Sequence, residues 1–255
     1  NNVDVAQGST YTWVGVPALA KSNVRVKVYD KDNTSVSGLS PAPGFNIVGS
    51  LTVTAPNGTP TREHWKVGTL QNITWNYSAV TNVQVYYSLN NGGSWTSLGI
   101  VPAVNGSLQW NIPEDLQVSN NALVKIEDTS NPTVVYDTSD QSFDIIASFN
   151  IKHPENGDTV IAEDSYLIEW DKYGSGVTGV ILEYSTNGGS SYNYVNPTSP
   201  YTVPNTGSYN WPSVPGGVLS NDCKVKITDP NNSNAYDIGA GSFWLRGDIT
   251  VTDPN

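Results

Sequence analysis

Apolar and polar residues alternate over short stretches along most of the chain, and a cluster of Gly, Pro, Asn or Asp ends each stretch. The alternation is plain in Val83, Val85 and Tyr87, and again in Val225 and Ile227. A period of two residues is typical of half-buried β-strands, and closely spaced turn residues are typical of an all-β sandwich. No long stretch has the apolar spacing and caps of a helix. The pattern therefore predicts an all-β fold.

The alternating stretches also repeat along the chain. Three segments share a Trp, a strand that ends in Asp, and a Phe; these anchors are Trp13, Asp30 and Phe45, then Trp110, Asp128 and Phe143, then Trp211, Asp229 and Phe243. The three Trp are 97 and 101 residues apart, and the three Phe are 98 and 100 residues apart. A unit of about 98 residues is the size of an immunoglobulin-like domain. We expect tandem immunoglobulin-like (fibronectin III-like) β-sandwich repeats.

The repeat divides the chain into four parts. We expect residues 1–50 to be the C-terminal part of one repeat, 51–148 and 149–247 to be complete repeats, and 248–255 to be the first strand of a further repeat. A half-sandwich has unpaired edges and an open apolar face, so something must complete it. The favoured expectation is that the chain continues beyond both ends. The alternative is that Ile249–Thr252 of one copy enters the open domain of the next.

The junctions between repeats are short and alike. Six residues lead from Phe45 to Leu51, and the same spacing recurs from Phe143 to Phe149 and from Phe243 to Ile249. No Pro-rich or Gly/Ser-rich linker intervenes. Identical spacing predicts similar rotations between domains, and hence a stiff rod of constant twist.

The residues that recur are expected in the repeat core, namely Trp13, Trp110, Trp211, Phe45, Phe143 and Phe243. The single cysteine, Cys223, aligns with the apolar residues Val24 and Ala122, which predicts a buried, unpaired thiol. In contrast, Trp65, Trp95 and Trp244 have no Trp mates and are predicted to be exposed contact residues.

Two segments fit the pattern S-x-[DN]-x-G-x-[ST]-W or its Tyr variant. The positions concerned are Ser88, Asn90, Gly92 and Trp95, and then Ser185, Asn187, Gly189 and Tyr192. They resemble the Asp-box of sialidases and related β-propellers, with Asn in place of Asp. Because the two copies lie 97 residues apart, which is far more than one propeller blade, we interpret them as structural hairpin turns.

The order of motifs from Trp65 through Ile73-Thr-Trp75 and Val124-Lys-Ile-Glu-Asp128 to Phe143 resembles an immunoglobulin-like repeat of very large bacterial surface proteins. It is also similar to the Kre9/Knh1-like domain of fungal wall-associated proteins. The second unit departs from this pattern, because it has no Trp to match Trp65 and has Gly239-Ala-Gly241 where the first has an Asp-containing run. The resemblance implies the fold and an extracellular, non-catalytic role.

Acidic residues follow the central strand of each unit and suggest calcium, with Asp128, Asp137 and Asp140 as the candidate ligands. The alternative is that these carboxylates accept local backbone N–H groups in Asx turns. His64, His153 and Cys223 form no recognisable metal motif, and no nucleophile or phosphate-binding motif is present. We therefore predict no enzyme activity and no cofactor, and we favour the Asx turns over calcium for these acids.

Charge narrows the possible partners. Only 14% of the residues are charged and the net charge is -11, which argues against nucleic acid and anionic lipid as partners. No apolar run is long enough for membrane insertion. We expect an extracellular or cell-surface structural segment of a filament, sheath or surface layer, whose partners are copies of itself or neighbouring repeats. The alternatives are the stalk of an adhesin and a carbohydrate-binding accessory module that contacts surface glycans.

Overall fold

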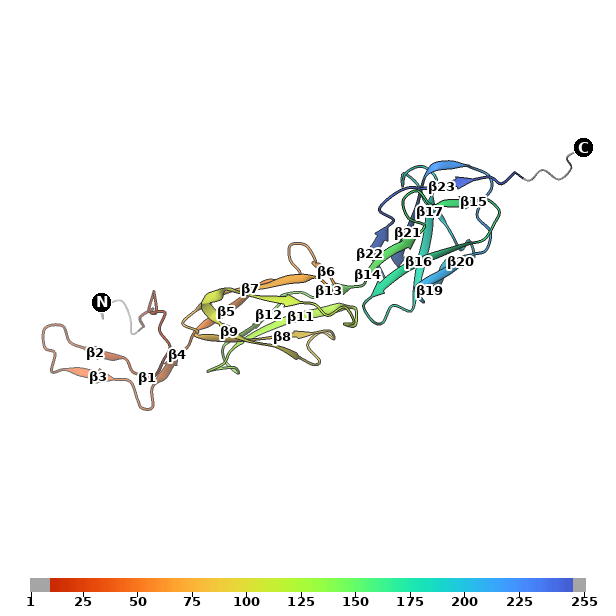
Figure 1. Ribbon diagram of the computed structural model, residues 1–255. Helices are drawn as coiled ribbons and strands as arrows, with labels where there is room; N and C mark the ends of the chain where they lie inside the picture. The colour runs from red at the N-terminus through yellow and green to blue at the C-terminus, as the bar shows by residue number, and fades with distance from the viewer. Residues whose placement is uncertain (1–9, 250–255) are drawn as a thin grey trace, which may run out of the picture.

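The computed structural model describes residues 10–249, which form β-strands and one short 3-10 helix. Figure 1 shows three parts in line: a small N-terminal β segment and two β-sandwiches. The predicted first strand of a further repeat, residues 248–255, lies almost wholly outside the described residues. No helix between residues 10 and 249 is long and apolar enough to cross a membrane.

The N-terminal segment has four short strands: β1 (Lys21–Val24), β2 (Lys27–Tyr29), β3 (Ser37–Leu39) and β4 (Phe45–Ile47). β1 pairs with β4 and β2 pairs with β3, both antiparallel. No second sheet covers these strands within residues 10–49. Trp13 and Phe45, expected in a repeat core, are therefore 42% and 41% exposed. The expectation is wrong for these two residues because the segment lacks the opposing strands.

The first sandwich places two sheets face to face. Its elements are β5 (Ser50–Ala55), β6 (His64–Lys66), β7 (Leu70–Ser78), β8 (Asn82–Ser88), β9 (Thr96–Pro102), η2 (Ala103–Asn105), β10 (Ser107–Asn111), β11 (Ser119–Asp128), β12 (Tyr136–Thr138) and β13 (Phe143–Ile146). The small sheet has the order β10-β7-β5, the large sheet has the order β6-β13-β11-β8-β9, and β12 also pairs with β11. All pairs are antiparallel except β6 with β13.

The second sandwich repeats this topology. Its strands are β14 (Ser148–His153), β15 (Thr159–Ile161), β16 (Tyr166–Tyr173), β17 (Gly179–Ser185), β18 (Asn193–Tyr194), β19 (Thr202–Pro204), β20 (Ser208–Trp211), β21 (Ser220–Asp229), β22 (Asn232–Ile238) and β23 (Phe243–Arg246). The sheet orders are β14-β16-β20 and β15-β23-β21-β17-β18, and β15 runs parallel to β23 as β6 does to β13. The prediction of immunoglobulin-like β-sandwiches is confirmed.

Each sandwich has its own core, in which Trp110 and Phe143, or Trp211 and Phe243, are buried. The prediction that Trp65 is an exposed contact residue is wrong: its ring lies 6.2 Å from that of Trp110 and 5.0 Å from that of Phe143. The parallel pairing of β6 with β13 turns Trp65 inward, and Val160 occupies the matching place in the second sandwich.

The other unmatched residues lie nearer the surface. Trp95 is half-buried and Trp244 is exposed. Cys223 is a free, fully buried cysteine, and burial raises the pKa of its thiol. A buried thiol with a raised pKa is a poor nucleophile.

Candidate functional site at the junction between the sandwiches

A single residue separates the last strand of the first sandwich from the first strand of the second. β13 ends at Ile146, β14 begins at Ser148, and Ala147 between them is fully buried. The chain therefore crosses from one core to the next without an exposed linker.

Backbone hydrogen bonds join the sandwiches a second time, away from Ala147. The N–H groups of Gly174 and Ser175 donate to the carbonyls of Glu114 (2.6 Å) and Leu116 (3.0 Å), and the N–H of Val118 donates back to Ser175 (3.0 Å). Gly174 has φ +91°, and a Cβ there would lie 3.0 Å from Cγ1 of Val118. Both its conformation and the close approach require glycine at this point.

Apolar side chains also cross the junction. Tyr173, from the second sandwich, packs against the core of the first. Val118, from the first sandwich, packs against the core of the second. Each core is thus completed by a side chain of its neighbour, which couples the position of one sandwich to the other.

A buried carboxylate connects polar groups of both sandwiches. Asp144 is 4% exposed. Its oxygens accept a hydrogen bond from Nε of Arg62 (2.6 Å), lie 2.8 Å from Nδ1 of His64, and accept Nδ2 of Asn232 (2.9 Å) from the second sandwich. Asn232 also donates to Oδ1 of Asn120 at 3.0 Å. A buried charge is tolerated only when it is paired in this way, so separating the sandwiches would leave Asp144 short of one partner.

A polar cleft of about 460 Å³ opens beside Asp144. It is lined by Arg62, Asn120, Asn121, Asp144, Asn231, Asn232 and Ser233. These groups can hold water or a hydrogen-bonding ligand. The arrangement is suited to fixing the angle between two domains.

The carboxylate of Asp144 is not repeated at the equivalent positions of the other two units. Asn46 and Trp244 occupy the positions that correspond to Asp144 when the three Phe anchors are aligned. The six-residue spacing therefore repeats, but the chemistry that locks the junction does not. This argues against one constant rotation at every junction.

The three calcium candidates each accept hydrogen bonds from different neighbours. Asp128 accepts the N–H of Ser130 and the side chain of Asn131, while Asp137 accepts the N–H of Val53 at 2.7 Å. Asp140 accepts the side-chain amide of Asn57. Among residues 10–249 these three acids do not form a group of close ligand atoms, and calcium binding itself stays a prediction.

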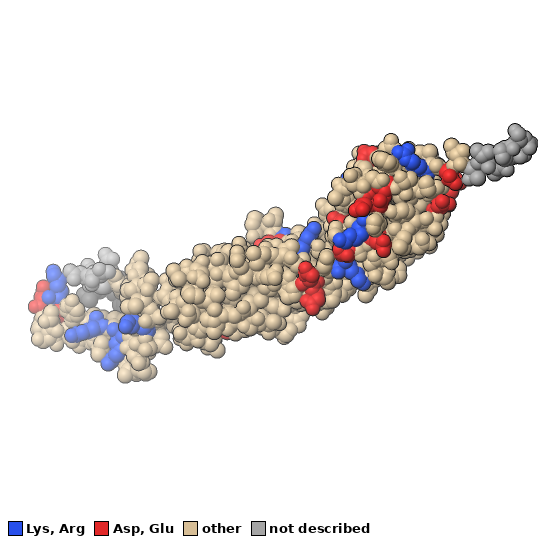
Figure 2. Space-filling model, viewed as in Figure 1, with Lys and Arg blue, Asp and Glu red and all other residues tan. Residues whose placement is uncertain are grey.

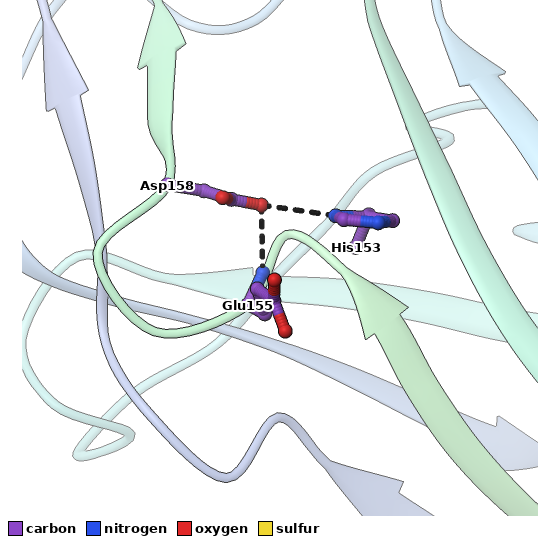
Figure 3. Close-up of side chains that lie close together, drawn as sticks. All are labelled: His153, Glu155 and Asp158. Atoms are coloured by element: carbon purple, nitrogen blue, oxygen red, sulfur yellow. Dashed lines mark hydrogen bonds and ion pairs between the residues drawn. The ribbon is translucent and has the colours of Figure 1, made fainter.

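A different group of possible metal ligands does come together, and the sequence interpretation missed it. His153, Glu155 and Asp158 offer ligand atoms within 4.8 Å of one another (Figure 3), the one such group of three found among residues 10–249. Oδ2 of Asp158 lies 3.1 Å from Nδ1 of His153 and accepts the N–H of Glu155 (2.9 Å) and the hydroxyl of Tyr166 (3.2 Å). The short H-P-E-x-x-D run was the only signal in the sequence.

Electrostatics tie this group together. The hydrogen bond to Asp158 raises the pKa of His153 above its usual value. Burial disfavours ionised Asp158, but the hydrogen bonds that it accepts outweigh burial and lower its pKa. In the first sandwich Glu63 accepts the N–H groups of Asn57 and Gly58 in the corresponding loop. The group therefore stabilises the loop between β14 and β15, and Oδ2 of Asp158 already has three hydrogen-bond partners.

The two predicted hairpin turns have the same hydrogen bonds. Ser88 Oγ donates to Asn90 Oδ1 and accepts the N–H groups of Asn90 and Gly92. Ser185 does the same with Asn187 and Gly189. Trp95 and Tyr192 take corresponding places: Nζ of Lys125 lies 5.3 Å from the ring of Trp95, and Nζ of Lys226 lies 5.3 Å from that of Tyr192.

No protein family model and no curated protein matches the chain. Among solved structures, the chain is similar to fibronectin(III)-like modules of Clostridium thermocellum CbhA (12% identity, TM-score 0.26, 77% of this chain and 94% of that one). It is also similar to the four N-terminal Ig domains of Dscam1 isoform 1.9 (11%, 0.36, 84% and 52%) and to the FN1-FN3 domains of chicken CNTN1 (15%, 0.28, 71% and 63%). At these scores the likenesses carry no argument, and the fold rests on the strand order given above.

Proposed function

We propose that the chain is a structural segment of an extracellular filament, sheath or surface layer, in which sandwiches joined end to end form a stiff array. One observation carries the proposal: the junction is closed by Ala147, by three backbone hydrogen bonds and by the bond from Asn232 to Asp144. Three separate connections fix a joint, whereas a flexible linker would allow the domains to rotate. The small fraction of charged residues and the burial of the single cysteine are compatible with a location outside the cell.

Small-angle X-ray scattering of dilute protein tests the stiffness of the joint. The native chain should give the profile of one elongated particle. A variant with a Gly-Ser-Gly-Ser insertion after Ala147 should give a broader distribution of dimensions, and Asn232→Ala should lie between the two. Asn193→Ala, an exposed residue away from the junction, is the control. If the native chain scatters like the insertion variant, the joint is flexible and the stiff array is refuted.

An adhesin stalk would need the same rod, so this experiment does not separate it from a filament. The position of binding activity separates them, since a stalk carries its binding domain elsewhere. Electron microscopy of the native assembly would show either continuous fibres or single projections that end in a distinct head.

A carbohydrate-binding accessory module is the second candidate, and one observation favours it. The rings of Tyr194 and Tyr201 stack at 4.3 Å with an interplanar angle of 14°, and both residues are exposed. Exposed aromatic rings of this kind offer an apolar face beside a hydroxyl group. Binding of soluble polysaccharides by native protein, lost in Tyr194→Ala, would support this role; no binding to a broad glycan panel would exclude it.

A further inference from the structure

The group of His153, Glu155 and Asp158 contains more possible metal ligands than its loop requires. The first sandwich shows the requirement, because it builds the equivalent loop between β5 and β6. There one carboxylate, that of Glu63, accepts two backbone N–H groups of the loop. In the second sandwich Asp158 accepts the N–H of Glu155 at 2.9 Å. Closure of the loop therefore explains Asp158, and it leaves His153 and the carboxylate of Glu155 unexplained.

Two groups near Asp158 occur in the second sandwich only. Ala55 and His153 each precede the first Pro of their loops. Across the small sheet, Ala55 pairs with Thr74. His153 pairs in the same way with Glu169. The second sandwich thus has an imidazole and a carboxylate where the first has Ala and Thr on the same backbone, so the fold itself does not require them.

The imidazole and the carboxylate stand at the spacing of two ligands of one metal ion. Nδ1 of His153 lies 3.1 Å from Oδ2 of Asp158. Two ligand atoms that are each about 2.0–2.2 Å from a tetrahedral zinc ion lie about 3.3 Å apart. An ion can therefore replace the proton between these two atoms, which is released to solvent, with little movement of either side chain.

The other members of the group fit the same ion. Glu155 offers a carboxylate oxygen within 4.8 Å of the ligand atoms of His153 and Asp158, and it is exposed, so its side chain can turn towards the ion (Figure 3). Oδ2 of Asp158 keeps the hydrogen bonds from the N–H of Glu155 and the hydroxyl of Tyr166. Hydrogen bonds of this kind orient a ligating carboxylate.

The charges that act on His153 have the sign that attracts a cation. The hydrogen bond to Asp158 is the largest cause of the raised pKa of His153, and the negative charges of Asp158, Glu155 and Glu169 act in the same direction. On the face drawn in Figure 2, acidic side chains lie over the second sandwich, whereas the first sandwich is largely uncharged. The field that holds a proton on the imidazole also favours a metal ion in its place.

The second histidine of the chain provides a contrast. His64 also lies beside a carboxylate, with Nδ1 2.8 Å from Oδ2 of Asp144. However, Asp144 is paired with the guanidinium of Arg62, whose positive charge repels a metal ion. A histidine next to an aspartate is thus common to both sandwiches, and the acidic surroundings are particular to His153.

We propose that His153, Glu155 and Asp158 bind one divalent transition-metal ion of the zinc class. Imidazole nitrogen together with carboxylate oxygen suits zinc and its neighbours, whereas calcium takes six to eight oxygens. Three protein ligands leave at least one position to water. The ion joins the end of β14 to the loop before β15 and so stabilises the second sandwich. This site is independent of the structural role proposed above, and neither depends on the other.

Isothermal titration calorimetry of the full chain with zinc chloride tests the site. Native protein should bind one zinc ion per chain. His153→Ala, which installs the residue of the first sandwich, should abolish this binding. Glu155→Asn should weaken it by about 10-fold or more, since removing even an outer partner of a ligand costs about 10–100-fold. Thr159→Ala, at an exposed position beside Asp158, is the control and should bind like native protein.

Thermal melts in zinc chloride and in EDTA give a second readout. Zinc should raise the Tm of native protein and of Thr159→Ala, and it should leave that of His153→Ala unaltered, because an ion stabilises only a protein that binds it. The melts in EDTA show that each variant is folded. The absence of saturable zinc binding by the native chain overturns the site. Binding that survives His153→Ala also overturns it, since the ion then lies elsewhere. An equal rise in Tm with calcium chloride would refute the assignment to a transition metal.

Discussion

Single acidic side chains perform the same local task in all three repeats. Asp30, Asp128 and Asp229 each accept the backbone N–H of the residue two positions later, which is an Asx turn at the end of the central strand. A carboxylate used in this way has exchanged water for a backbone donor, which accounts for an Asp at the end of the central strand without a bound ion. The spacing of acids in the sequence cannot distinguish these uses, because both place Asp directly after a strand.

At this scale, His153 makes the stability of the second sandwich depend on pH. Its pKa is raised in the folded state by the hydrogen bond to Asp158. The stabilisation is therefore fully present below the unfolded pKa of about 6.5 and is lost as the pH rises through the folded pKa. His153→Ala, which installs the residue found at the equivalent position Ala55, should remove this dependence. Because the pair is substantially exposed, the loss should be only about 0.5 kcal/mol. Urea unfolding at pH 5 and pH 8.5 gives the free energy of unfolding of each protein at both pH values. The same change of this free energy with pH in native protein and in His153→Ala would contradict the assignment.

Elements were easier to predict than their contacts. Alternation in β8 and β21 and the recurring Trp and Phe predicted the all-β fold and two cores, because burial of one sheet face imposes a period of two. The environment of Trp65 was not predictable in that way. Val160 stands at the equivalent position and is also buried, but it is not a Trp, so the repeat of Trp residues gave no sign of a core position. The parallel pairing of β6 with β13 joins strands that are far apart in the sequence.

An Asp side chain joins the two sheets of each sandwich by a hydrogen bond to a backbone N–H group. Asp237 accepts the N–H of Ile151 at 2.9 Å, and Asp137 accepts that of Val53 at 2.7 Å. Asp237→Ala should lower the free energy of unfolding by about 1.5–3 kcal/mol, the cost of losing a charge-assisted bond and leaving the N–H unpaired. Asp115→Ala, at an exposed position, should be neutral. Urea denaturation of the three proteins decides this, and equal midpoints would show that water replaces the carboxylate.

The hairpin turn of the second sandwich depends on one hydroxyl group. Ser185 is fully buried and its Oγ accepts the N–H groups of Asn187 and Gly189. Ser185→Ala should destabilise the protein by about 1–3 kcal/mol, since two donors lose their acceptor. Ser190→Ala in the same hairpin is exposed and serves as the control. Thermal melts of both variants test the difference; a larger effect of Ser190→Ala would be inconsistent with the turn geometry.

For the whole molecule, spacing predicted that the sandwiches follow each other closely, but it did not predict what holds them. Asn232 and Asp144 are 88 residues apart in sequence. In the sequence Gly174 is indistinguishable from other turn glycines, and only the structure shows that it lies against Val118. Such contacts arise from the relative orientation of two folded domains. The repeat pattern does not predict this orientation, because the positions equivalent to Asp144 hold Asn46 and Trp244.

The junction should make the two sandwiches unfold as coupled units. Leu182 is fully buried in the second core, and Leu182→Ala should cost about 2–5 kcal/mol there. If Tyr173, Val118 and the backbone bridge transmit stability, the first sandwich should also unfold more easily, by about 1 kcal/mol, or roughly 4–8 °C for a domain of this size. Hydrogen exchange of β11 measures the first sandwich alone, in native protein and in Leu182→Ala. Repeating both measurements with Gly-Ser-Gly-Ser inserted after Ala147 supplies the control, because the insertion should abolish the effect on β11. Exchange in β11 that is indifferent to Leu182→Ala in the native junction would mean that the contacts fix an angle between the sandwiches without coupling their stabilities.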